Sequence, residues 1–255
     1  RDLHKEYRRQ RQMCIRDRLL PDASSEHGLE YDNLMWISFA IIFFTQTITQ
    51  ALLHYFAYKY RGEKGKKALF YADNDRLEAI WTIIPVIALA GLILYGLYTW
   101  TDIMTVEEND DALVVELYAQ QFNWKARYAG DDGVLGDANV RFLNDYDGRN
   151  TVGIDSSDPN GLDDVVVTQE FHLPVDRKVI FKFRSQDVLH SAYMPHFRAQ
   201  MNCVPGMITQ FSFTPTITTA DMRMNADVVD KVNRINKIRY ENSQELIAKG
   251  EESLE

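Results

Sequence analysis

Two long stretches of the chain contain no charged side chains. Residues 34–57 and residues 79–100 lack Asp, Glu, Lys and Arg. Each is long enough to cross a bilayer as an α-helix, which needs about 20 mostly apolar residues. Trp36, Trp81 and Trp100 lie near the ends of these stretches, where interfacial aromatic residues are expected. We therefore predict two transmembrane helices here, rather than two buried helices of a soluble protein.

The loop between the two predicted helices, residues 58–78, is basic, whereas both outer flanks lack Lys and Arg. The loop contains Lys59, Arg61, Lys64, Lys66, Lys67 and Arg76. Short basic loops stay in the cytoplasm, so we expect both ends of the hairpin to lie outside. Residues 19–33 then form an outer flank, and everything from residue 101 is exported. The predicted location is the bacterial inner (plasma) membrane, as a multi-pass protein with its soluble domain on the periplasmic side.

The first predicted helix carries a polar stripe. Gln46, Gln50 and His54 recur at four-residue steps, which places them on one face of a helix. Polar side chains at membrane depth usually turn toward another helix, where they find hydrogen-bond partners. We expect a larger membrane partner; the alternative is that the second helix of this chain satisfies them.

Residues 101–219 have the pattern of a small β domain. Four short apolar or alternating runs, rich in Val, Phe and Tyr, are bounded by Asp, Gly and Pro; they read ALVVELYAQQFNW, DVVVTQEFHL, KVIFKFRS and MITQFSFTP. Their spacing indicates a sandwich or Greek-key barrel. A polar insertion, residues 129–163, fits a solvated loop better than a calcium loop, because Ser156 and Val167 stand where the EF-hand pattern needs acidic ligands.

The two ends of the chain differ from the rest. Residues 220–255 have helix-forming composition, with apolar residues at three- and four-residue steps, and we predict an amphipathic helix or helical pair. Residues 1–18 contain the string QMCIRDR, which is typical of translated adaptor read-through. We expect this segment to be non-native and leave it out of the fold.

Composition limits the possible chemistry. The net charge of −9 argues against a nucleic-acid partner and suits a basic protein partner. Cys14 and Cys203 are the only cysteines, too few for a disulfide framework or a four-thiolate zinc site. Metal chemistry must therefore use histidine, methionine or ligands from outside this chain.

Residues 186–206, QDVLHSAYMPHFRAQMNCVPG, concentrate the metal-ligating side chains. With Met207 just beyond them, they offer His190, His196 and Cys203, the residue types of a mononuclear blue-copper site. The order is wrong for such a site, because both histidines precede the cysteine. We expect Cys203 to be a small buried residue instead.

Three motifs occur in order: EAIWTIIP in the hairpin, ELYAQQFNWKARYAG at the start of the β domain, and the stretch around His190. With the predicted topology, they resemble cytochrome c oxidase subunit II of the haem-copper oxidases, over residues 20 to about 217. The resemblance implies a two-helix transmembrane hairpin followed by an all-β cupredoxin-like Greek-key domain, here with a helical C-terminal insertion.

The resemblance also implies a dinuclear copper centre, CuA, which accepts electrons from cytochrome c or a similar donor. The electrons would pass to haem in partner subunit I, where oxygen reduction is coupled to proton pumping. His190 occupies the position of one copper ligand. The family's other ligands come from a later loop with two cysteines, a backbone carbonyl, a second histidine and a methionine. No Cys follows Cys203 and no His follows His196, so we expect a truncated, inactive fragment.

Two more positions gain roles from the resemblance. Glu78 lies where the family has a carboxylate at the mouth of a proton-uptake route; the alternative is an interfacial charge that sets helix depth. Phe122 replaces a tryptophan linked to electron input, so Trp124 becomes the candidate, with core packing as the alternative. Asn202 replaces an acid that helps relatives to dock the cytochrome, so docking would rely on other acids.

Two other functions stay open. A copper-free, quinol-oxidase-like subunit II with a structural role would explain the missing ligand loop, although His190 has little reason to remain in it. A free membrane-tethered copper carrier is disfavoured by the polar stripe, which calls for a membrane partner.

Overall fold

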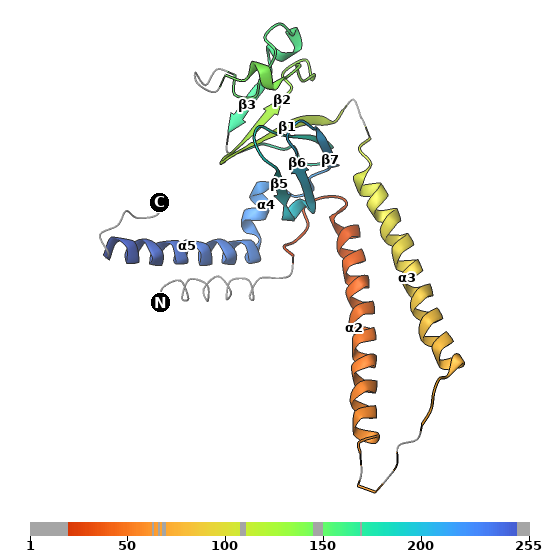
Figure 1. The fold of residues 1–255 in the computed structure, drawn as a ribbon. Helices are drawn as coiled ribbons and strands as arrows, with labels where there is room; N and C mark the ends of the chain where they lie inside the picture. The colour runs from red at the N-terminus through yellow and green to blue at the C-terminus, as the bar shows by residue number, and fades with distance from the viewer. Residues whose placement is uncertain are drawn as a thin grey trace.

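The computed structural model describes residues 20–62, 64–65, 67, 70–107, 111–144, 150–168 and 170–248. Two long helices run side by side from a β domain at one end, and a further helix projects from the same end across their direction (Figure 1). The predicted fold class is confirmed, because the apolar hairpin, the β domain and the helical C-terminal part are all present. The predicted non-native segment 1–18 lies outside the described residues.

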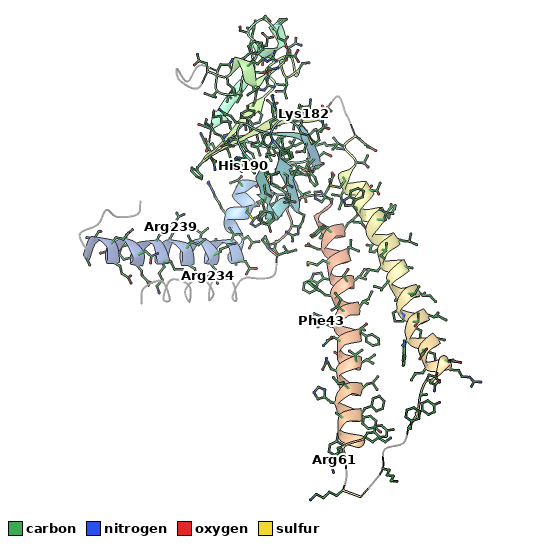
Figure 2. The ribbon with its side chains drawn as sticks, viewed as in Figure 1. Phe43, Arg61, Lys182, His190, Arg234 and Arg239 are labelled. Atoms are coloured by element: carbon green, nitrogen blue, oxygen red, sulfur yellow. The ribbon has the colours of Figure 1, made fainter. Side chains whose placement is uncertain are left out.

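The hairpin consists of α2, Gly28–Lys59, and α3, Asp75–Met104, both long and apolar enough to cross a membrane. Both helices extend past the uncharged stretches, because their polar flanks are helical too. The side chain of Asn74 caps α3 by accepting the Leu77 N–H at 3.1 Å. Most side chains of α2 and α3 are exposed, as in Figure 2 around Phe43, so the hairpin requires lipid or another protein around it.

The β domain has a five-stranded sheet in the order β3-β2-β1-β4-β7, with a separate hairpin of β5 and β6. Its strands are β1 Leu113–Gln120, β2 Asn123–Tyr128, β3 Val165–Thr168, β4 Val179–Ser185, β5 His190–Met194, β6 Ala199–Cys203 and β7 Thr209–Phe213. Among the strands that the structure describes, β1 and β4 pair in parallel and the other pairs are antiparallel. The first predicted run divides into β1 and β2, because the chain turns at Gln121 and Phe122.

Alternating residues of the strands form the apolar core. Val115 and Leu117 of β1 pack with aromatic residues of β4 and β7. The ring of Phe181 stacks on Phe183 and Phe213, each at a centroid distance of 5.6 Å. Because β5 and β6 also add buried side chains to this cluster, their hairpin is held against the sheet.

The opposite side of β1 and β2 carries buried charges. Glu116 and Arg127 are 3% and 2% exposed, and their side chains form an ion pair at 2.7 Å. Arg127 also pairs with Asp164 at 3.1 Å, while Arg184 pairs with Glu116 at 3.0 Å. The guanidinium groups reach the insertion as well, since Arg127 donates to the Gly136 carbonyl at 2.9 Å. Residues 129–163 are therefore not wholly a solvated loop; part of the insertion packs on the sheet.

The segment before α2 attaches the β domain to the hairpin. The Ser24 N–H donates to the His196 carbonyl at 2.6 Å, and the Ser25 hydroxyl donates to the Phe197 carbonyl at 2.8 Å. Arg198 contacts Asp32 through two nitrogens, at 2.7 and 2.8 Å. The turn between β5 and β6 is thus fixed to the outer end of α2.

The helical segment predicted after the β domain is present, and of the two forms left open, one helix or a pair, it is a pair: α4, Thr219–Met224, and α5, Ala226–Ala248. Thr218 caps α4 by accepting the Asp221 N–H at 3.1 Å. Asn225 separates the two helices and caps the start of α5 through its side-chain oxygen, which accepts the Asp227 N–H at 3.0 Å.

Replacing Arg127 with Met tests the buried charges. We expect the free energy of unfolding to fall by about 3–5 kcal/mol, because Glu116 and Asp164 would remain buried without their guanidinium partner. Denaturation of the full chain in detergent micelles, followed by near-ultraviolet circular dichroism, measures this loss. The control, Arg177→Met, removes an exposed bond to the Asp111 carbonyl and should cost less than about 1 kcal/mol. Equal losses in the two variants would contradict the expectation.

Candidate metal site

His190 is the first residue of β5 and follows a short loop from β4. The loop is fixed at both ends: the Gln186 N–H donates to the Ala119 carbonyl at 2.9 Å, and the Ser185 hydroxyl donates to the Val188 carbonyl. Figure 2 labels His190 within the β domain, away from the membrane-spanning part of the hairpin. The imidazole thus has a defined position on a rigid element.

Asp187 orients the imidazole. Its carboxylate lies 2.7 Å from Nε2 of His190, and also accepts the N–H groups of Gln121 at 2.8 Å and Val188 at 2.7 Å. The hydrogen bond with His190, followed by that from Gln121, lowers the pKa of Asp187 from 3.8 to about 2. With the carboxylate as acceptor, Nε2 carries the proton, and Nδ1 remains for a metal. A carboxylate behind an imidazole is the usual support of a metal-bound histidine.

Sequence reasoning missed Asp187. The signal for it was its place three residues before His190 in QDVLH, within reach across one tight turn. A histidine with an acidic residue at that spacing deserves testing as an oriented pair, because the carboxylate fixes both the ring and its tautomer.

Trp124 lies beside His190. The two rings meet edge to face, with centroids 5.8 Å apart. Trp124 is half-buried on β2 and packs against the core, whereas Phe122, in the preceding turn, is 98% exposed. The structure therefore brings Trp124 and His190 together and leaves Phe122 at the surface.

The structure does not bring together the residues of the mononuclear blue-copper site considered from the sequence. Cys203 lies opposite His190 in the hairpin but is 0% exposed, and burial raises the pKa of its thiol to about 11, so it stays protonated at neutral pH. His196 lies at the far end of the hairpin, with Nδ1 3.2 Å from the Asp22 carbonyl. The expectation that Cys203 is a small buried residue is confirmed.

The described residues do not form a complete copper site. Across the part of the chain that the structure describes, no group of three or more His, Cys, Asp or Glu side chains is placed to hold a metal ion. His190 fits the role of one ligand, because its imidazole is oriented by a carboxylate. No electron-transfer step through copper follows from these residues alone.

Glu78 lies far from the other candidates. It is exposed in the first turn of α3, where its N–H donates to the Asn74 carbonyl at 2.9 Å. The β domain adjoins the opposite end of this 30-residue helix (Figure 1). Glu78 and His190 therefore belong to separate sites.

Family models divide the chain as the structure does. The model of the cytochrome c oxidase subunit II transmembrane domain matches residues 10–99, and that of its periplasmic domain matches residues 113–221. The chain belongs to the cytochrome c oxidase subunit II family. It is therefore a membrane-anchored protein with a soluble domain on the periplasmic side.

Two subunit II relatives show how much of the family's length is present. The chain is 35% identical over 188 residues to the alternative cytochrome c oxidase subunit 2 of Bradyrhizobium diazoefficiens, covering 73% of this chain and 66% of the relative. It is 25% identical over 183 residues to cytochrome c oxidase subunit 2 of Alkalihalophilus pseudofirmus, covering 69% of this chain and 44% of the relative. The chain spans less than two thirds of either relative.

Among solved structures, the chain is similar to the periplasmic domain of subunit II of cytochrome oxidase from Bradyrhizobium japonicum. The match has 22% identity and a TM-score of 0.29, and covers 45% of this chain and 70% of the other.

The contact between Asp187 and His190 predicts that this loop of the subunit II domain keeps the hydrogen bonds to Asp187 down to an unusually low pH. A carboxylate whose pKa is lowered on folding stabilises the folded state above its unfolded pKa, and that contribution is lost as the pH falls through its folded pKa. The N–H signals of Gln121 and Val188, which donate to Asp187, should therefore shift in NMR spectra near pH 2. A transition near 3.8, the ordinary value, would contradict the observed hydrogen bonding.

Proposed function

We propose that this chain acts as subunit II of a respiratory cytochrome c oxidase. It would accept electrons from cytochrome c at a CuA centre and pass them to haem in subunit I, where oxygen reduction is coupled to proton pumping. The observation that supports this function best is the His190 imidazole, held by Asp187 at 2.7 Å with Nδ1 left for a metal. Family membership supplies the context.

His190 would be one ligand of the copper centre. The family's two cysteines, second histidine and methionine are not among the residues of this chain. Once complete, the centre would supply a one-electron carrier with soft sulfur and imidazole ligands. In this chain, Asp187 would fix the tautomer and angle of His190, and the core behind β5 would keep the ring in place.

Trp124 is the proposed residue of electron input. The centroids of its ring and the His190 ring are 5.8 Å apart, so an electron that reaches the indole is already beside the proposed copper ligand. The fully exposed Phe122 would lie between Trp124 and a docked donor, as a surface contact rather than a carrier. The acidic net charge suits a basic donor protein such as cytochrome c.

The hairpin would hold the subunit against subunit I. Gln46, Gln50 and His54 are all exposed on α2. The His54 ring already bonds the Gln50 carbonyl at 2.7 Å, which is how an isolated helix satisfies a polar side chain. A partner helix on this face would supply the remaining donors and acceptors.

Changing His190 to Asn in the complete oxidase complex tests the copper assignment. We expect most CuA copper and its absorbance bands to be lost, because an essential ligand is removed. Asp187→Asn should be intermediate, with copper affinity lower by about 10–100-fold, since it removes only the orienting carboxylate. The matched control is His196→Asn, six residues further on, which should retain full copper. Metal analysis and absorbance measure all three.

The outcomes separate the candidate functions. If the unaltered complex holds no CuA copper, the copper-free structural subunit takes the place of this proposal. If His196→Asn loses as much copper as His190→Asn, the loss of copper reflects damage to the β5–β6 hairpin rather than removal of a ligand.

Glu78 is proposed as the mouth of a proton-uptake route, because it is an exposed carboxylate at the inner end of α3. Glu78→Gln should slow oxygen reduction by the complex about 10-fold or more, since a positioned proton carrier is removed. Asp75→Asn, in the same first turn, is the control and should be near normal. Equal rates for Glu78→Gln and the unaltered complex would leave Glu78 as a charge that sets helix depth.

A further inference from the structure

A cavity of about 460 Å³ lies where the outer ends of α2 and α3 meet the β domain. Figure 1 shows both helix ends adjoining that domain. The walls are mostly apolar and aromatic, and include Tyr31 and Leu34 of α2, Gly96 and Trp100 of α3, Tyr193 of β5 and Phe211 of β7. A cavity of this size and composition, at the junction of two parts of a protein, is typical of a site for a small molecule.

The cavity straddles the outer boundary of the predicted membrane region. The uncharged stretch of α2 begins at Leu34, and that of α3 ends at Trp100. Leu34 and Gly96 therefore lie within the outermost turn of the hydrocarbon core, whereas Tyr31 lies about one turn above Leu34. Tyr193 belongs to the β domain and lies outside the core. A molecule in this cavity must be apolar at its inner end and polar at its outer end.

Aromatic residues with polar tips surround the outer part of the cavity. Tyr31, Trp100 and Tyr193 are 44%, 60% and 63% exposed, and each combines an apolar ring with a hydrogen-bond donor. Such side chains suit the membrane interface, where the ring meets acyl chains and the donor meets the polar part of the lipid. Among the lining residues that the structure describes, the basic side chain, Arg198, is already bonded to Asp32 at 2.7 and 2.8 Å. Headgroup charge is therefore not the selecting feature.

The cavity and the polar stripe lie on different faces of α2. At about 100° per residue, Tyr31 and Leu34 lie about 130° around the helix from Gln50, the middle residue of the stripe. The face proposed to meet subunit I is thus not the face that lines the cavity. A membrane partner bound along the stripe leaves the cavity side of α2 open to the bilayer.

Gly96 provides part of the space in the cavity. A Cβ atom built on Gly96 meets no atom within 4 Å, so a larger side chain fits there without a backbone clash. Gly91, in the same helix, is equally open but is not among the residues that line the cavity. It lies about 140° around α3 from Gly96. The two glycines form a matched pair for testing what the cavity holds.

We propose that this cavity binds a phospholipid of the outer leaflet. One acyl chain lies between the outer ends of α2 and α3, and the ester region lies at Tyr31, Trp100 and Tyr193. The bound lipid fills the space between the membrane hairpin and the β domain. This inference goes beyond the proposed electron transfer and does not depend on copper, because it rests on the shape and composition of the cavity.

Photo-crosslinking tests the proposal. The full chain is reconstituted in phosphatidylcholine vesicles that contain a small fraction of phosphatidylcholine with a diazirine on the upper part of one acyl chain. We expect cross-links on residues 193–200 of the β domain, which the acyl chains reach only through the cavity. Gly96→Leu should lower these cross-links at least about fivefold, because the leucine side chain occupies the space of the lipid. Gly91→Leu is the control and should change them less than about twofold.

Both leucine variants should fold, since leucine is a better helix former than glycine, and circular dichroism verifies this. A second variant, Tyr193→Phe, removes only the phenol donor at the rim and should also lower the cross-links, because the ester loses a hydrogen-bond partner.

Three results would overturn the proposal. Equal cross-linking in the Gly96→Leu, Gly91→Leu and unaltered chains would show that the probe reports only general contact with the bilayer. Cross-links confined to α2 and α3, with none on residues 193–200, would show that lipid does not enter the cavity. In the complete oxidase complex, loss of the lipid cross-links on residues 193–200 would show that another subunit, rather than lipid, occupies this site.

Discussion

The contact between Arg198 and Asp32 joins the membrane hairpin to the β domain, and the position of the candidate site depends on it. The guanidinium binds both carboxylate oxygens of Asp32 and also donates to the Pro21 carbonyl at 2.6 Å. Its side chain is 3% exposed, so this bidentate, charge-assisted contact is largely protected from water. Arg198 has a φ of 51°, in the left-handed region, which its bonds to three residues help to offset.

The hairpin of β5 and β6 links His190 to this contact and so fixes its position. One end of the hairpin, at Arg198, is attached to α2, and the other begins at His190. The five-residue strand β5, paired with β6, connects the two, and Ala192 of β5 and Ala199 of β6 are buried in the core. Asp187 adds a second attachment, because it bonds the turn between β1 and β2 through Gln121. The imidazole is thus fixed relative to both the sheet and the membrane anchor.

The periodic parts of the chain were predictable from sequence. Uncharged stretches identified both membrane helices, and the alternation of apolar and polar residues identified β4 and β7. Both signals depend only on the local sequence pattern. The turn at Gln121 and Phe122 was missed, since FNW continues the apolar run without Gly or Pro. The contacts of Arg127, Arg198 and Asp187 were also missed. Each joins residues brought together by the fold or by a turn, which periodicity does not reveal.

The candidate site was predictable only in part, for a physical reason. His190 could be located from its motif, but its orientation depends on a hydrogen bond to Asp187, and Trp124 reaches it through the pairing of β1 and β2. The motif thus identifies the residue, whereas the tertiary fold determines which side chains surround it and how its ring is oriented.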